Sequence, residues 1–186
     1  MARPKSLISP TSSNFIKILA LRFIAFLGVI PLLFGCAYRL GPTGGFAAGE
    51  KSILVMPFSN QTLEPRLTDA VTAQLRKQFQ RDGTFRLATH DDGDIVVTGI
   101  ITKYTRHELS FQPADTLTAR DYRLSMTAQV TARERISGKV VLDQEISGFT
   151  LLRVGVDLVS SERQGLPLLA GDLARNVTSR LADGSW

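Results

Sequence analysis

The feature that most constrains the fold is a strict two-residue alternation across residues 121–133, where apolar and polar residues take turns. Successive side chains of a β-strand point to opposite faces, so the alternation predicts a long strand with one buried and one polar face. The predicted buried side chains are Tyr122, Leu124, Met126, Ala128, Val130 and Ala132. The predicted exposed ones are Arg123, Ser125, Thr127, Gln129, Thr131 and Arg133.

Further strands are predicted by short apolar runs rich in β-branched residues. A turn at 136–139 connects the alternating segment to one of them, in which Val140, Leu142 and Ile146 are predicted to be buried. Pro113 favours a loop over 111–117. The predicted additional strands are residues 51–58, 84–87, 95–104 and 140–147.

Two segments have the spacing of amphipathic helices. The first is predicted over 65–81, with Pro65 in its first turn and Gly83 as a left-handed cap. The second either begins at a capping box formed by Ser161 and Gln164, with a kink at Pro167, or begins later, near Leu166. The predicted apolar stripes are Leu67, Val71, Leu75 and Phe79, and Leu166, Leu169, Ala170, Leu173, Val177 and Leu181.

The order of these elements predicts an α+β fold for a single domain over residues 51–186. Two helices are expected to pack on one face of a mainly antiparallel four- to five-stranded sheet. Gly and Pro punctuate residues 36–50, which we interpret as a tether.

The N-terminal segment combines four basic residues with an uncharged apolar run that ends at Cys36. These are the parts of a secretory signal peptide, predicted over 1–35. Leu33-Phe34-Gly35-Cys36 resembles the lipobox of bacterial lipoproteins, in which the cysteine is acylated and becomes the new N-terminus. A transmembrane anchor is one alternative, but spanning a membrane takes about 20 apolar residues, and this run is shorter and is interrupted by Pro31. An ordinary signal peptide followed by a chance cysteine is the other alternative.

Removal of residues 1–35 changes the charge of the protein. The whole chain has 22 basic and 17 acidic residues, but four basic residues leave with the signal, so the rest has a net charge of +1. The excess of basic over acidic residues in the whole chain therefore does not indicate nucleic-acid binding. With its single cysteine, Cys36, acylated, the chain has no thiol left for a disulfide, and the covalent lipid is the only cofactor-like group expected.

No catalytic or metal site is predicted. His90 and His107 are the only histidines, too few with Cys36 lipidated for a transition-metal site. The carboxylate pairs Asp91/Asp92 and Asp143/Glu145 are more typical of surface turns than of acid–base catalysis. We therefore expect a protein that is not an enzyme.

Arginines near the predicted hairpin are the candidate binding residues. If neighbouring strands pair, they make the polar face partly cationic, and such a face can bind an anionic lipid head group through charge-assisted hydrogen bonds. The alternative is that basic side chains only keep an open sheet soluble. The candidates are Arg106, Arg120, Arg123 and Arg133.

Several segments resemble the LptE family, the outer-membrane lipoproteins of lipopolysaccharide assembly. The resemblance lies in the pattern and order of these segments, and it covers nearly all of the predicted mature chain. They are residues 36–40 (CAYRL), 53–62 (ILVMPFSNQT), 93–99 (GDIVVTG), 121–124 (DYRL) and 137–143 (SGKVVLD).

The resemblance implies a plug inside the LptD β-barrel translocon that helps the barrel assemble and assists lipopolysaccharide insertion into the outer leaflet. It implies a lipid anchor on Cys36 at the periplasmic face of the outer membrane, and lipopolysaccharide and an LptD-like barrel as partners. Residues 55–62 also resemble the opening strand of LpoB- and CsgG-type periplasmic lipoproteins. Those activate cell-wall synthases or form secretion pores, which is the alternative function.

Overall fold

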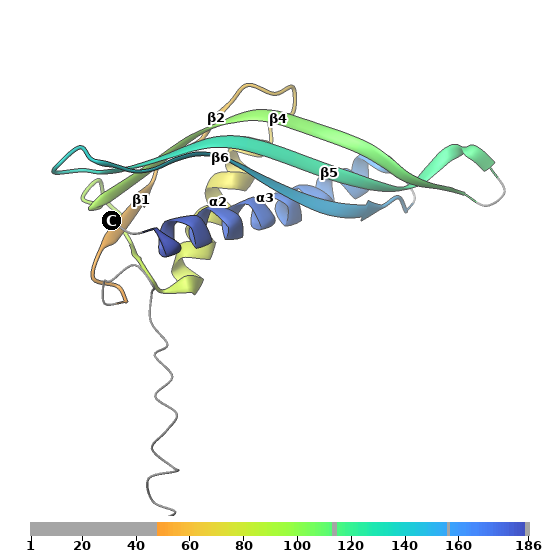
Figure 1. Cartoon of the computed structure of the whole chain (residues 1–186). Helices are drawn as coiled ribbons and strands as arrows, with labels where there is room; N and C mark the ends of the chain where they lie inside the picture. The colour runs from red at the N-terminus through yellow and green to blue at the C-terminus, as the bar shows by residue number, and fades with distance from the viewer. Residues whose placement is uncertain (1–47, 113–114, 156, 185–186) are drawn as a thin grey trace, which may run out of the picture. The chain divides into compact units, whose positions relative to one another are not determined.

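The fold is a single layer of strands with two helices on one of its faces (Figure 1). The structure is a computed structural model that describes residues 48–112, 115–155 and 157–184, all within the unit Gly41–Trp186. The predicted signal peptide, Cys36 and all but the last three residues of the tether lie outside the described residues. The α+β class predicted from the sequence is confirmed.

The described part of the chain forms a six-stranded sheet in the order β3-β1-β4-β5-β6, with β2 pairing β4 off this path. Three long strands, β4, β5 and β6, make up most of the sheet and arch over the helices (Figure 1). The elements in chain order are β1 (Ser52–Val55), β2 (Ser59–Asn60), α2 (Leu67–Asp82), β3 (Arg86–Leu87), β4 (Ile95–Gln112), β5 (Asp115–Glu134), β6 (Val140–Arg153) and α3 (Leu158–Asp183).

The sheet is mixed, which corrects the expectation of a mainly antiparallel sheet of four to five strands. Hairpins join β4, β5 and β6, and these pairs are antiparallel. By contrast, β1 pairs in parallel with both β3 and β4, and β2 pairs in parallel with β4. The parallel pairs arise because α2 follows β1 and β2 and returns the chain to the end of the sheet where β1 starts. The next strands therefore run in the same direction as β1.

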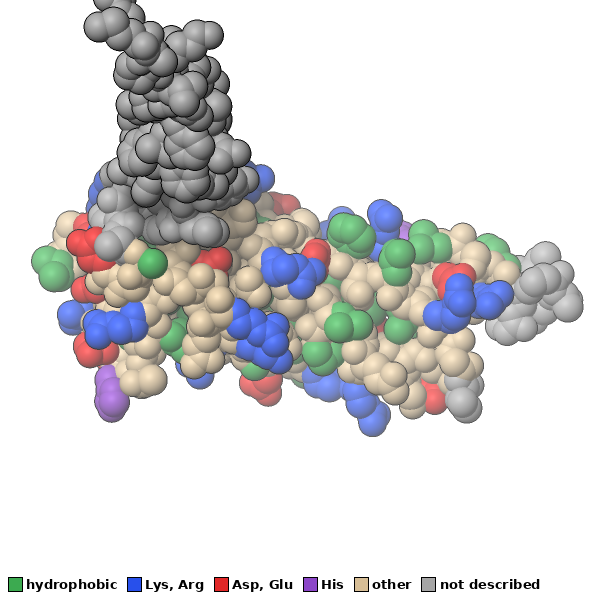
Figure 2. Space-filling model, turned by 90° about the horizontal axis from the view of Figure 1, so that it is seen from below, with side chains coloured by type: hydrophobic (Ala, Val, Ile, Leu, Met, Phe, Trp, Pro, Cys, Tyr) green, Lys and Arg blue, Asp and Glu red, His purple; other side chains and the backbone are tan. Residues whose placement is uncertain are grey.

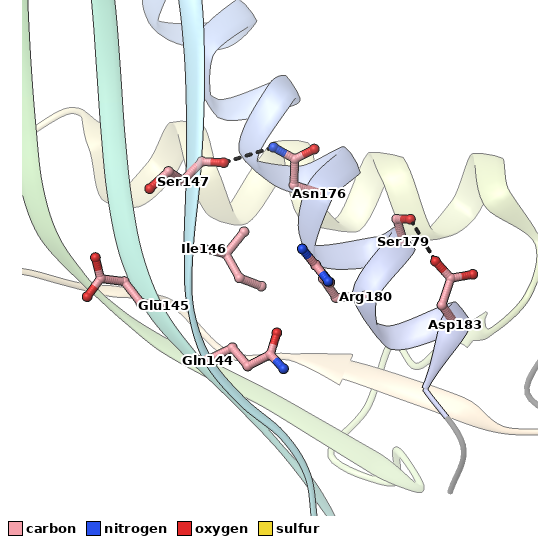
Figure 3. A pocket seen from close by; sticks show the side chains of 8 residues that line it. All are labelled: Gln144, Glu145, Ile146, Ser147, Asn176, Ser179, Arg180 and Asp183. Carbon is pink, nitrogen blue, oxygen red and sulfur yellow. Dashed lines mark hydrogen bonds between the residues drawn. The ribbon is translucent and has the colours of Figure 1, made fainter.

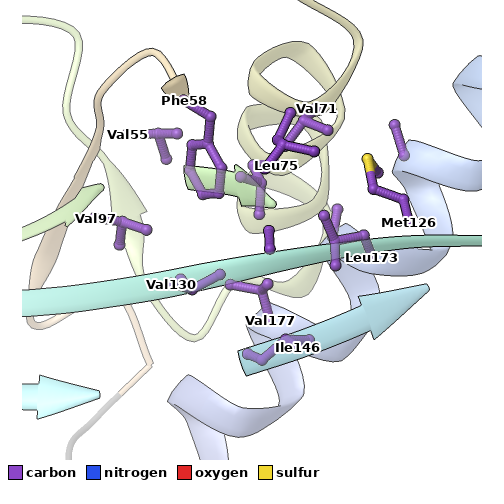
Figure 4. Packing of buried hydrophobic residues seen from close by; sticks show 14 of the residues in the cluster. Val55, Phe58, Val71, Leu75, Val97, Met126, Val130, Ile146, Leu173 and Val177 are labelled. Carbon is purple, nitrogen blue, oxygen red and sulfur yellow. The ribbon is translucent and has the colours of Figure 1, made fainter. Parts of the chain in front are cut away.

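The hydrophobic core lies between the sheet and the helices (Figure 4). The alternation in β5 is confirmed, because Leu124, Met126, Ala128, Val130 and Ala132 are fully buried and Tyr122 packs against the core as a partly buried side chain. Both predicted helical stripes are also buried. The binary pattern of the sequence therefore decided which face of each element the core covers.

The first helix agrees with its prediction except at its start. It begins at Leu67, after the cap residue Arg66, so Pro65 precedes the helix and does not occupy its first turn. At its end Gly83 adopts φ 74° and donates its backbone N–H to the Phe79 carbonyl at 3.3 Å. The left-handed cap predicted for Gly83 is confirmed.

The second helix begins earlier than either alternative predicted. Asp157 caps it by accepting a hydrogen bond from the Ser160 backbone N–H at 2.7 Å, so the capping box at Ser161 is wrong. Ser161 instead lies in the first turn and donates its hydroxyl to the Asp157 carbonyl. Pro167 lies inside the helix with an exposed side chain, and solvent can satisfy the carbonyl that loses its donor there.

Two predictions along the long hairpins are also wrong. The predicted loop at 111–117 is mostly strand, because β4 continues to Gln112 and β5 begins at Asp115. Cross-strand pairing supplies hydrogen bonds that local turn propensity does not register. Val140 is exposed and not buried, because a register shift between Ala132 and Arg133 pairs Val140 with Arg133 on the polar face. The turn at 136–139 and the two-residue strand β3 are confirmed.

Neither described helix has the combination of length and apolarity needed to span a membrane. The β4–β5 hairpin reaches beyond the end of α3, so the distal part of the sheet has no helix over it (Figure 1). Two kinds of surface are thus available on one sheet: a face covered by helices and a face that no described element covers.

Candidate interaction surface

The open face is the side of β4, β5 and β6 opposite the helices. Its centre is a cross-strand network of short polar side chains. Gln129 donates to the Asp143 carboxylate at 2.6 Å, Thr131 donates to the same oxygen at 3.2 Å, and the Thr127 and Ser147 hydroxyls lie 2.9 Å apart. These bonds link side chains of β5 and β6 across the sheet and form a polar surface at its centre.

Arg123 and Arg133 lie on the open face, as the alternation predicted. The Arg133 guanidinium donates to the Gly138 carbonyl at 2.8 Å and so closes the β5–β6 turn. The Arg123 guanidinium lies over the Phe149 ring, 5.0 Å from its centroid. A cation–π contact of this kind leaves the guanidinium N–H groups available for an anionic ligand. Phe149, an exposed aromatic between Gly148 and Thr150, was not among the predicted residues.

Arg120 lies at the distal end of the sheet, near a second charged cluster. Its backbone carbonyl accepts a hydrogen bond from Val154, and its side chain is exposed. The neighbouring Asp121 pairs with Arg153 at 2.8 Å and accepts from Ser110 at 2.5 Å. The Arg153 hydrogen bond is the main reason that the pKa of Asp121 is lowered, and the same bond raises the pKa of Arg153. Arg120 therefore lies beside a carboxylate held in its ionised form.

Arg106 is not on the open face. It pairs in register with the buried Leu124, and its guanidinium forms an ion pair with Glu162 of α3 at 3.0 Å. The Tyr104 hydroxyl donates to the same carboxylate. Burial, and then the bond to Glu162, raises the pKa of Tyr104, so this phenol stays protonated. The structure thus separates Arg106 from Arg123 and Arg133.

A β-bulge explains the position of Arg106. Ile101 and Lys103 pair with adjacent residues of β5, so Thr102 is an extra residue and the alternation changes phase. Before the bulge odd-numbered residues of β4 face the helices, and after it even-numbered residues do. The adjacent pair Ile100 and Ile101 lies before the bulge and still alternates, since Ile100 is exposed and Ile101 is buried, so no local pattern in the sequence marks the bulge.

The outer edge of β6 is partly covered by polar side chains of α3. Asp172 accepts from the Phe149 backbone N–H at 2.9 Å, and Asn176 donates to the Ser147 carbonyl at 2.8 Å (Figure 3). Between them Gly148 lets the helix approach, because a Cβ there would lie 2.6 Å from the Leu173 backbone nitrogen. Edge strands covered in this way are protected from pairing with other chains.

The described residues contain no group of three or more His, Cys, Asp or Glu side chains placed to hold a metal ion. The open face is instead a surface for contact, with hydroxyl, amide and guanidinium groups spread over three strands. Its chemistry suits hydrogen bonding to a polar surface or to anionic groups.

Comparison with known proteins identifies the family. Residues 50–181 match the family model LptE, lipopolysaccharide-assembly. The match covers more than half of the chain, so this protein belongs to the LptE family and is a lipopolysaccharide-assembly lipoprotein of the cell envelope. The resemblance inferred from the sequence is confirmed. No curated protein sequence matches the chain.

Solved structures resemble this chain at low sequence identity. The hypothetical protein CT253 from Chlamydia trachomatis is 11% identical with a TM-score of 0.53, over 73% of this chain and 96% of that one. A minor lipoprotein from Acinetobacter baumannii is 15% identical with a TM-score of 0.46, over 71% of this chain and 92% of that one. PelC from Paraburkholderia phytofirmans is 17% identical with a TM-score of 0.46, over 73% and 91% of the two chains.

Proposed function

We propose that this chain is an outer-membrane lipoprotein, anchored through acyl groups on Cys36, that occupies the lumen of an LptD-like β-barrel and assists lipopolysaccharide insertion. The role is non-enzymatic. The observation that carries the proposal is the polar network at the centre of the open face, in a member of a lipopolysaccharide-assembly family. Large membrane barrels enclose a polar lumen, and a plug needs a polar surface on a rigid core.

The arrangement of the two faces supports this role. Core packing against α2 and α3 fixes the shape of β4, β5 and β6, and the opposite side chains are held by their own hydrogen bonds. A surface ordered in this way loses little conformational entropy on binding. Arg123 and Arg133 add positive charge that suits the phosphates of lipopolysaccharide.

Site-specific photo-crosslinking tests the contact with the barrel. A photo-reactive amino acid at Thr127, in the middle of the open face, is expected to give an adduct with a large β-barrel protein in native membranes. The same amino acid at Gln164, an exposed position on α3, is the matched control and should give less of that adduct. If a penicillin-binding protein is captured and no barrel protein, the LpoB- or CsgG-type alternative replaces this proposal.

Charge reversal tests the contact with lipopolysaccharide. Arg123→Glu together with Arg133→Glu should weaken lipopolysaccharide binding without unfolding the protein, because both side chains lie on the open face. The control reverses the same number of charges at Arg163 and Arg180, which are exposed on α3. Equal loss in both variants would show a general charge effect, with no specific role for the open face.

The anchor is tested separately. Cys36→Ser should leave an unprocessed precursor that incorporates no palmitate, because the thiol is the acyl acceptor in a lipobox. Normal palmitate labelling of this variant would rule out Cys36 as the lipidation site.

A further inference from the structure

We propose that, while the domain is outside the barrel, a basic groove on its helix side docks onto the anionic phospholipid surface of the membrane that holds the lipid anchor. The groove lies between α2, α3 and residues Phe149 and Thr150 of β6. It shares Phe149 with the open face but holds none of the arginines discussed above. Its lining includes Lys77 and Arg81 from α2 and Pro167, Leu168 and Arg175 from α3.

The groove is positively charged. Three of its lining side chains are basic, and none is acidic. Arg175 has one carboxylate neighbour outside the lining, Asp172, at 2.7 Å. Within the described part of the chain, Lys77 and Arg81 are exposed and make no hydrogen bond or ion pair. The pocket at Tyr104, in contrast, combines Lys103 and Arg106 with Glu64 and Glu162, so its charges are balanced.

Apolar side chains beside these cations favour a lipid surface over a purely polar partner. Leu168 is 63% exposed on the same stretch of α3 as the exposed Pro167. Figure 2 shows this side of the domain, with basic and apolar side chains next to each other over its middle. Basic residues that flank exposed Leu or Phe side chains are typical of segments that lie in a membrane interface.

The chain length between anchor and domain makes the contact possible. Eleven residues, 37–47, separate the predicted acylated residue from the first described residue, and this length of chain can span at most about 40 Å. The anchor therefore keeps the groove close to the bilayer and raises its effective concentration there. The proposal rests on the anchor at Cys36, which is part of the proposed function.

Fluorescence of the full lipoprotein in vesicles tests the docking. Leu168→Cys provides a thiol for an environment-sensitive fluorophore, since the native Cys36 is the chain's only cysteine and is blocked when acylated. In vesicles with phosphatidylglycerol the label should shift to the blue and be quenched by lipid-borne quenchers. It should remain solvent-exposed in pure phosphatidylcholine. Thr131→Cys, on the open face, is the matched control and should not shift in either lipid.

Charge reversal separates docking from anchoring. Each basic residue near an anionic surface contributes about five-fold in affinity, so Lys77→Glu with Arg81→Glu should lower the ratio of docked to undocked protein at least about 25-fold. Vesicle flotation of this variant should stay unchanged, because the acyl chains still hold it. A label at position 168 that stays exposed in phosphatidylglycerol vesicles, while the protein floats, would overturn the docking and leave the anchor intact. Failure to float at all would overturn both, and equal protection in both lipids would exclude recognition of anionic lipid.

Discussion

The two faces of one sheet differ in what they tolerate, although the same strands supply both. On the helix side, the β5 side chains from Leu124 to Ala132 are fully buried, so a larger or charged replacement has no space there. On the open face, residues one position away in the same strand are partly exposed and bonded only to their neighbours. The comparison teaches that β5 contributes to the core through one face only, so the side chains of the other face can be altered without disturbing the core.

The strongest test of this comparison is a charge placed on each face at adjacent positions. Met126→Asp puts an unpaired carboxylate in the core and should cost more than about 4 kcal/mol, enough to prevent cooperative folding. Thr127→Asp, on the open face, should change stability by no more than about 0.5 kcal/mol. Thermal unfolding followed by circular dichroism measures both. Equal effects would mean that the two faces do not differ as described.

The next test concerns the close approach of α3 to the sheet. Gly148→Ala introduces a Cβ within 2.6 Å of the Leu173 backbone and should destabilise the domain by about 1–3 kcal/mol. Gly155→Ala is the control, since the nearest atom there is the Ser161 hydroxyl at 4.0 Å. Urea unfolding gives both free energies. If Gly148→Ala unfolds with the same free energy as the wild type, α3 and the edge strand β6 can move apart without loss of stability.

A smaller, pH-dependent effect is expected where β1 meets β4. Hydrogen bonds from the Ser52 backbone N–H and hydroxyl to the Asp94 carboxylate, at 2.8 and 2.7 Å, lower the pKa of Asp94. Its contribution to stability is therefore present above the unfolded pKa, about 3.9, and is lost as the pH falls through the lower folded value.

Asp94→Asn should flatten the fall in stability below about pH 4, and Ser52→Ala should do the same because it removes the hydroxyl bond. The measurement is the free energy of unfolding from pH 2 to pH 7. A wild-type slope in both variants would show that another group carries the acid sensitivity.

The smallest effect is expected from the ion pair that joins β4 to α3. Arg106 and Glu162 have side-chain exposures of 43% and 14%, and pairs of this kind contribute about 0–1 kcal/mol. A double-mutant cycle with Arg106→Ala and Glu162→Ala measures the coupling. If the same variants weaken lipopolysaccharide binding while the coupling is small, recognition is not confined to the open face.

Much of the fold followed from periodicity. The buried face of β5, the stripes of both helices and the cap at Gly83 were all predicted, because each depends on the spacing of residues close in the chain. The errors at 111–117 and Val140 have a different origin. Both depend on which residue of the partner strand lies opposite, and local sequence does not encode that.

The candidate site was predicted in part for the same reason. Arg123 and Arg133 lie on the predicted face because the alternation in β5 is unbroken between them. Arg106 lies on the other face because the bulge at Thr102 changes the phase of β4. The basic groove of Lys77, Arg81 and Arg175 could not be predicted at all, since it needs two helices brought side by side.

The sequence by itself determined the class of the fold, the polar and apolar faces of its main strand, and the LptE family. Those properties are local patterns, or a chain-long order of such patterns. Only the tertiary structure decided that β1 and β2 pair in parallel with β4, that Arg106 meets Glu162, and where basic side chains gather. Each of these joins residues far apart in the chain, and their meeting depends on the packing of all the elements together.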